Sequence, residues 1–149
     1  MAKRMGREIR WAKGKDLPAI QRIDREVVSN PPGRSVQIAE AIERQQCRVI
    51  LSNSRIVGFM TWSTSSFRES DFINLLVVDA NCRRQGFASA LLKDFQDISA
   101  GGIAWTSTNA SNSSMRSLLK KWNWIESDHS EELDPGDPDL FYSWQREEI

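Results

Sequence analysis

The sequence predicts a single domain of the α/β class, with a mixed sheet of about seven strands flanked by about four helices. Its length of 149 residues suffices for one domain with a substantial core and leaves little room for a second. Strand-like apolar segments alternate along the chain with segments whose apolar residues recur every three or four positions, as in helices. Residues 72–78 are apolar on both faces of a strand, which is typical of a middle strand with helices on each side of the sheet.

The first half of the chain predicts a strand, two helices and a hairpin. Asp16 can cap the first helix, which residues 30–33 (NPPG) end, and Ser35 can cap the second. Residues 52–54 form a turn signal between two runs of β-favouring residues, which predicts the hairpin. The expected elements are a strand at 8–12, a helix over Leu17–Val27, a helix over Ser35–Ile42, and strands at 48–52 and 55–63.

The second half continues from the apolar strand with alternating helices and strands. Gly101 and Gly102 end the helix that follows this strand, and Asn109 or Ser111 can cap the next helix. A strong turn signal at 134–138 (DPGDP) separates the last two strands. The expected elements are a helix at 85–97, a strand at 103–107, a helix ending near Trp122, and strands at 123–127 and 140–145, which completes the order βααβββαβαββ.

Composition and charge limit the kinds of partner, the cellular location and the metal sites that we expect. The chain has 20 basic and 20 acidic residues, so its net charge gives no reason to expect nucleic acid or an anionic membrane surface as a partner. No apolar stretch approaches the roughly 20 residues that span a bilayer, and the first residues lack a secretory signal, so we expect a cytoplasmic protein. Cys47, Cys82 and the single histidine, His129, have no metal-ligand spacing, so neither a metal site nor a disulfide framework is expected.

The segment Arg83–Ala88 (RRQGFA) has the character of a phosphate-binding turn. A strand that leads into a basic, glycine-bearing turn and then a helix brings free backbone N–H groups, a helix dipole and positive side chains together. Gly86 would let the backbone approach a ligand, and Arg83 and Arg84 would add ion pairs to phosphates. In the alternative interpretation, the glycine only supplies a positive φ and the arginines are solvated.

The element order and this Arg-x-x-Gly-x-Ala turn resemble the GNAT-type N-acetyltransferase superfamily, from Ile9 to about Gln145. The most specific part is residues 75–92 (LLVVDANCRRQGFASALL), where the family carries a strand, a loop, Gln/Arg-x-x-Gly-x-Gly/Ala and an apolar helix. Residues 111–124 resemble the later asparagine-containing helix of the family, although they end in Asn-Trp instead of Gly-Phe. The resemblance implies one GNAT-like N-acetyltransferase domain over 1–149, with a GNAT-like acyl-CoA acyltransferase fold.

The resemblance also implies a site for acetyl-CoA as cosubstrate, without a metal. The strand before the turn would expose its backbone to the pantetheine arm, and the N–H of Val78 would donate to the thioester oxygen, a contact of about 3 kcal/mol. Asn112 would hold the arm from the other side, or it would merely cap its helix. The implied cofactor-binding residues are Leu76, Val77, Val78, Arg83, Arg84, Gln85, Gly86, Phe87, Ala88, Ser89 and Asn112.

Proton transfer is harder to assign. Many relatives carry a general-acid tyrosine where this chain has Leu119, and some that acetylate peptides carry a glutamate at the position of Ser107. We therefore consider Tyr142, the only tyrosine, as a candidate acid, and Asp71 and Glu26 as candidate bases. The alternative is a packed aromatic ring for Tyr142 and solvated carboxylates for the other two.

The implied acceptor is a primary amine of a small molecule, protein or peptide, attacked directly in a ternary complex. Residues 126–139 carry seven acidic side chains that would favour a cationic acceptor, or that form a solvated loop. The last strand and the hydrophobic faces can support a homodimer. Two other classes stay open, a non-catalytic acyl-CoA-binding module and an interaction protein on the same fold.

Overall fold

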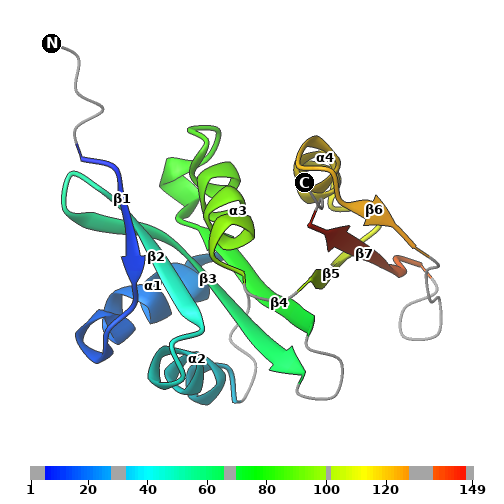
Figure 1. Ribbon diagram of the computed structural model, residues 1–149. Helices are drawn as coiled ribbons and strands as arrows, with labels where there is room; N and C mark the ends of the chain where they lie inside the picture. The colour runs from blue at the N-terminus through cyan, green and yellow to red at the C-terminus, as the bar shows by residue number, and fades with distance from the viewer. Residues whose placement is uncertain (1–5, 28–32, 66–69, 100–101, 128–135, 147–149) are drawn as a thin grey trace, which may run out of the picture.

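The computed structural model describes residues 6–27, 33–65, 70–99, 102–127 and 136–146. One seven-stranded sheet has the strand order β1-β2-β3-β4-β5-β7-β6 (Figure 1). Its strands are β1 (Glu8–Trp11), β2 (Cys47–Ser52), β3 (Arg55–Ser65), β4 (Ser70–Val78), β5 (Ile103–Asn109), β6 (Ile125–Glu126) and β7 (Asp139–Gln145). The helices are α1 (Leu17–Val27), α2 (Arg34–Glu43), α3 (Phe87–Ile98) and α4 (Ser113–Lys121), with short 3-10 turns η1 (Gly14–Asp16) and η2 (Ala80–Cys82).

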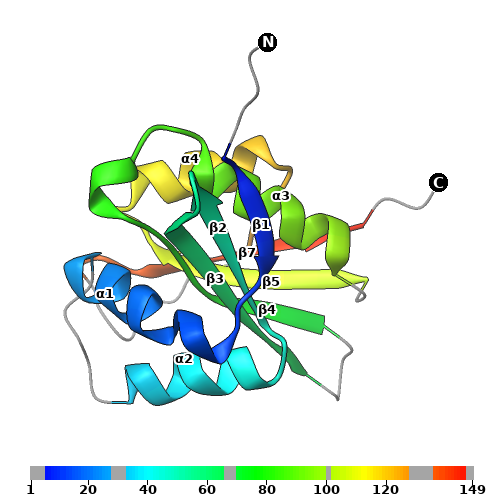
Figure 2. The ribbon, with the colours of Figure 1, turned by 90° about the vertical axis from the view of Figure 1, so that its left-hand side faces the viewer.

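The helices cover the two faces of the sheet in pairs. Helices α1 and α2 lie on one face, where Ile20, Ile23 and Ile38 are buried against Phe59 and its neighbours (Figure 2). Helices α3 and α4 lie on the other face, where a second core contains Leu91, Leu92, Phe95 and Leu119, among others. This arrangement confirms the predicted fold class and element order.

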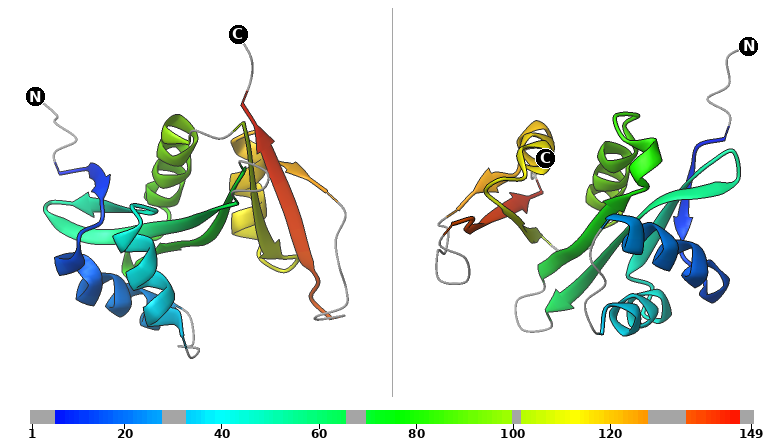
Figure 3. Two further views of the ribbon diagram at one scale, coloured as in Figure 1. Left: turned by 60° about the horizontal axis from the view of Figure 1, so that its bottom comes forward. Right: turned by 180° about the vertical axis from the view of Figure 1, so that it is seen from behind.

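Strand β4 is the fourth of the seven strands, as its two apolar faces predict. It pairs with β3 in antiparallel fashion along its whole length, from Ser70 to Val78. Its parallel pairing with β5 is much shorter and ends where Ile73 lies opposite Thr106. Beyond this point β5 pairs only with β7, so the sheet opens between β4 and β5 (Figure 3).

A β-bulge lies at the point where the sheet opens. Thr61 of β3 pairs with Leu75 and the next residue, Trp62, pairs with Ile73, so Asn74 is an extra residue in β4. An extra residue bends its strand and increases the local twist. The bulge keeps β4 joined to β3 while its last five residues turn away from β5.

Several helix starts differ from the sequence prediction. Asp16 does not cap α1: it ends η1, and its carboxylate accepts the Lys13 N–H at 2.7 Å and pairs with the Arg10 guanidinium. Helix α2 begins at Arg34, one residue before the expected cap. Asn112, and not Asn109 or Ser111, caps α4. A propensity pattern does not resolve a helix start to within one or two residues.

In the part of the chain that the structure describes, no helix has both the length and the apolar character needed to cross a bilayer.

The Arg10–Asp16 pair makes the stability of the N-terminal segment depend on pH. The hydrogen bonds from Arg10 are the main cause that lowers the pKa of Asp16 below its ordinary value. The carboxylate therefore stabilises the fold above about pH 4, and this contribution disappears as the pH falls through the lower folded pKa. We expect Asp16→Asn to lower the free energy of unfolding by about 1–3 kcal/mol at pH 7. Urea unfolding from pH 7 to pH 2.5 should show the two proteins converging at low pH, and a constant difference would contradict the assignment.

Candidate functional site

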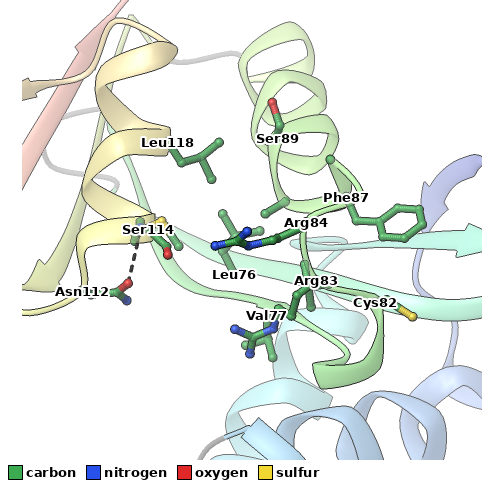
Figure 4. A pocket seen from close by; sticks show the side chains of 14 residues that line it. Leu76, Val77, Cys82, Arg83, Arg84, Phe87, Ser89, Asn112, Ser114 and Leu118 are labelled. Carbon is green, nitrogen blue, oxygen red and sulfur yellow. Dashed lines mark hydrogen bonds between the residues drawn. The ribbon is translucent and has the colours of Figure 1, made fainter.

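A cleft of about 760 Å³ lies where β4 and β5 diverge, between the N-terminal ends of α3 and α4 (Figure 4). Its apolar lining comes from the end of β4 and from α4, where Leu76 and Val78 lie opposite Met115 and Leu118. Its polar lining comes from the turn before α3 and from the start of α4. The full set is Leu76, Val77, Val78, Cys82, Arg83, Arg84, Gly86, Phe87, Ala88, Ser89, Asn112, Ser114, Met115 and Leu118.

The turn before α3 brings backbone donors to the cleft. Gly86 is the N-cap of α3 with φ of 83°, and Arg84 also has a positive φ, 62°. The Ala90 N–H donates to the Gly86 carbonyl at 3.0 Å, which is the first bond of the helix, so the N–H groups before residue 90 have no helical partner. A Cβ on Gly86 would meet only the Arg7 guanidinium, at 3.7 Å or more, so the positive φ is what favours glycine here.

Two arginines of this turn are exposed, and neither forms an ion pair with any residue that the structure describes. The side chain of Arg84 extends across the cleft toward α4 (Figure 4). Together with the free N–H groups and the helix dipole, Arg83 and Arg84 make this end of the cleft strongly favourable for an anion. The rest of the cleft is mostly apolar, which suits a ligand with a charged end and a less polar arm.

Asn112 stands on the opposite rim. Its side-chain oxygen accepts the Met115 N–H at 3.2 Å, so it caps α4, as one of its two interpretations proposed (Figure 4). It also lines the cleft, because the first turn of α4 forms that wall. Capping does not use the side-chain NH₂ group, which leaves a donor for a ligand.

Two tryptophan indoles form hydrogen bonds between α3 and the end of α4, the helices on either side of the cleft. Trp122 Nε1 donates to Ser89 Oγ at 2.7 Å, and Trp124 Nε1 donates to Gln96 Oε1 at 3.1 Å. Both bonds join the end of α4 to α3. Sequence reasoning missed these bonds, since nothing in the spacing of residues 89 and 122 links the two side chains.

Asp79 stabilises the 3-10 turn η2, which leads into the turn before α3. It is 1% exposed and accepts the Asn81 N–H at 3.0 Å, which caps η2. Its other oxygen lies 3.6 Å from Arg22 Nη1 and 4.0 Å from Arg55 Nη2. Sequence reasoning missed this residue, although an aspartate that directly follows a buried strand and precedes a turn is a recognisable capping signal.

Two of the candidate proton-transfer residues, Tyr142 and Asp71, do not line this cleft. Tyr142 is 0% exposed and packs in the core beneath α4; its hydroxyl donates to Glu126 Oε1 at 2.9 Å and accepts from Arg116 Nε at 3.2 Å. Burial is the main cause that raises the pKa of Tyr142. Asp71 is buried at the start of β4, with its oxygens bound to Thr64 Oγ1 at 2.6 Å and Ser99 Oγ at 2.8 Å.

Through these contacts Tyr142 and Asp71 stabilise the fold, and neither residue lines the cleft. Glu26 lies in the last turn of α1, and its side chain is outside the described part of the protein. Leu119, at the position where relatives carry tyrosine, is 1% exposed and belongs to the core. Ser107 lies on β5 opposite Phe141.

Neither cysteine, Cys47 or Cys82, forms a disulfide. Cys47 is buried, and burial raises the pKa of its thiol to about 12, so the thiol stays protonated and unreactive. Cys82 is partly buried at the edge of the cleft. The described residues contain no group of three His, Cys, Asp or Glu side chains that could hold a metal ion.

Comparison with known proteins identifies the family of this chain. The model of the acetyltransferase (GNAT) domain matches residues 22–131. The crystal structure of a GNAT-family acetyltransferase from Bacillus cereus ATCC 10987 is 31% identical with a TM-score of 0.87, and the match covers 95% of this chain and 99% of that one. The chain therefore belongs to the GNAT acetyltransferase family, which confirms the resemblance seen in its sequence. Among curated proteins, none matches this sequence.

More distant structures share the fold. The ribosomal-protein-S18-alanine N-acetyltransferase from Escherichia coli is 18% identical, with a TM-score of 0.81 and coverage of 96% of both chains. The putative acetyltransferase yncA from Salmonella typhimurium, solved with its cofactor acetyl-CoA, is 17% identical, with a TM-score of 0.79 and coverage of 96% of this chain and 95% of that one. At these identities the likeness concerns the fold alone.

The Tyr142 hydroxyl should matter for stability. In Tyr142→Phe, the ring stays buried but its bonds to Arg116 and Glu126 are lost, so we expect the free energy of unfolding to fall by about 1–2 kcal/mol. Urea unfolding at pH 7 measures this change. A variant as stable as the wild type would show that the hydroxyl does not support the fold.

Proposed function

We propose that the protein is an N-acetyltransferase that transfers the acetyl group of acetyl-CoA to a primary amine by direct attack in a ternary complex. The observation that carries the proposal is the opening of the sheet after Ile73, directly beside a helix start with two arginines that have no described ion-pair partner. Membership of the GNAT acetyltransferase family supports the same reaction class.

The proposed cosubstrate matches the chemistry along the cleft. The pyrophosphate would be bound by the N–H groups from Gly86 to Ser89, and Arg83 and Arg84 would pair with its charges or with the ribose phosphate. The pantetheine arm would lie against Leu76, Val77 and Val78, whose strand has no partner on the β5 side. Gln85 and Phe87 would contribute mainly through their backbone, and Asn112 would donate its amide to the arm.

The reaction itself needs few side chains. The amine nitrogen would attack the thioester carbonyl carbon, and the Val78 N–H would stabilise the oxyanion. The C–S bond then breaks to release the thiolate of coenzyme A, which takes a proton from water. The amine loses its proton to a base or to water. The roles of Tyr142, Asp71 and Glu26 in these transfers stay predictions, and the contacts of the first two favour a structural role.

The acceptor is proposed only as a class. Three acidic residues of segment 126–139 are already bonded within the fold: Glu126 to Tyr142, Asp137 to Ser111, and Asp139 to Asn109. The bonds to neutral groups restrict where these carboxylates point, and Glu126 also pairs with Arg116, which offsets its charge toward a cationic amine. Small amines and peptide N-termini should both be tested as acceptors.

We also propose that the protein can form a homodimer, and light scattering in solution measures its oligomeric state.

Turnover and binding test the proposal together. We expect thiol release from acetyl-CoA to require an amine, and Arg84→Ala with Gly86→Glu to weaken acetyl-CoA binding by at least about 100-fold, because a charge pair is lost and a carboxylate enters the anion site. The matched control, Arg44→Ala with Gly102→Glu, makes the same change in charge at exposed positions, and Gly102 has open space for a side chain.

The alternatives predict different results in the same assays. Acetyl-CoA binding without thiol release across a broad panel of amines and peptides would identify a non-catalytic acyl-CoA-binding module. No thermal shift at millimolar acetyl-CoA would favour an interaction protein, since ligand at 100 times its Kd adds about 2.7 kcal/mol to stability.

A second kinetic prediction concerns Tyr142. Because its hydroxyl is buried and bonded to Glu126 and Arg116, we expect Tyr142→Phe to keep kcat for acetyl transfer within about threefold of the wild type, far less than the 10²–10⁴-fold loss typical of a missing general acid. Steady-state kinetics below the melting temperature of the variant measure this. A loss of kcat above 100-fold with unchanged KM would instead establish Tyr142 as the acid.

A further inference from the structure

The turn before α3 is held from outside the cleft by Arg7. The Arg7 guanidinium donates from Nη2 to the Gln85 carbonyl, and its carbon lies 4.5 Å from the centre of the Phe87 ring. Arg7 does not line the cleft, whereas Gly86, the residue between these two contacts, does. The beginning of β1 lies beside this turn in the fold (Figure 2). The Arg7 side chain thus contacts the turn on both sides of Gly86, at Gln85 and at Phe87.

The backbone before β1 fixes the position of Arg7. The Gly6 carbonyl accepts the Asn53 N–H at 2.9 Å, and Glu8 begins the pairing of β1 with β2. Gly6 has φ of 98°, and a Cβ there would lie 2.3 Å from Asn53 Oδ1, so only glycine fits this close approach. Arg7 is therefore held between two fixed points on the hairpin formed by β2 and β3.

The Gln85 contact sets the direction of a neighbouring donor. The described part of the chain has no cis peptide bond, so the carbonyl of Gln85 and the N–H of Gly86 point in opposite directions. If Arg7 holds the carbonyl outward, the Gly86 N–H faces the cleft. Arg7 also places a third guanidinium close to the turn that carries Arg83 and Arg84.

We propose that Arg7 is a positioning residue for the phosphate-binding turn: it orients the Gln85–Gly86 peptide so that the Gly86 N–H donates to the pyrophosphate of the cosubstrate. This inference rests on the proposed function, because it concerns the same cosubstrate. It assigns a role to a residue 78 positions away from its partner in sequence and outside the turn.

Ligands that carry or lack the pyrophosphate test the role. Titration calorimetry with coenzyme A, 3′-dephospho-coenzyme A and pantetheine is carried out on the wild type, Arg7→Ala and Arg7→Lys. For Arg7→Ala we expect Kd to rise about 5- to 10-fold for both phosphate-bearing ligands, the size expected for one lost hydrogen bond and an exposed cation–π contact. Pantetheine binding should change less than about twofold, and Arg7→Lys, which keeps the charge and one donor, should recover part of the loss.

A second measurement follows the donor itself. In ¹H–¹⁵N spectra, coenzyme A should shift the Gly86 amide strongly in the wild type and much less in Arg7→Ala. Arg44→Ala is the matched control, because it removes an exposed arginine from the end of α2 and should bind all three ligands like the wild type.

The outcomes separate this inference from the function on which it rests. A wild type that does not bind coenzyme A would overturn the proposed function. A wild type that binds it while Arg7→Ala binds equally well would overturn only the role of Arg7. An equal loss for pantetheine and coenzyme A, or an unchanged Gly86 amide shift, would also overturn it, because Arg7 would then support the fold in general.

Discussion

The extra residue in β4 is the constraint on which the candidate site depends. Asn74 breaks the register with β3 just after Ile73, and pairing with β5 ends at the same place. Without the bulge, a parallel pair would continue and its side chains would fill the space now lined by Leu76 and Val78. At the bulge, β4 loses its hydrogen bonds to β5, which leaves a strand edge that can bind a ligand. Pairing with β3 continues and holds that edge in place.

Where the sheet opens between β4 and β5, the strands no longer hold each other in place. Packing and hydrogen bonds between α3 and α4 hold the two parts of the sheet together there. Both helices belong to the same core, and the indole bonds of Trp122 and Trp124 join them where the strands beneath them separate. Arg116 extends this support: it binds the Ala110 carbonyl, Tyr142 and Glu126, and so links α4 to β6 and β7. The cleft is therefore bounded by fixed elements on all the sides that the structure describes.

Local patterns predicted much of this from the sequence. The apolar run at 72–78 predicted the central strand, and Arg83–Ala88 predicted the basic turn before α3 that lines the cleft, because both depend on residues adjacent in the chain. The bulge at Asn74, the Arg7–Gln85 contact and the Ser89–Trp122 bond could not be predicted, since each depends on which distant residues meet after folding. The contacts of Tyr142 and Asp71 could not be predicted for the same reason: spacing places a residue on an element, but tertiary contacts decide whether its polar atoms are free.

Asp71 and Tyr142 show why ionisable residues near a site are poor guides by themselves. Each is buried and uses its oxygen atoms in bonds that hold elements together, so freeing either group for proton transfer would leave buried partners unsatisfied. The described residues that line the cleft contain arginines, hydroxyls and an amide, but no carboxylate or phenol. Those side chains and the backbone suit the proposed binding of an anionic thioester. The proposed chemistry then depends on positioning and oxyanion stabilisation, for which the N–H of Val78 at the edge of β4 is the proposed donor.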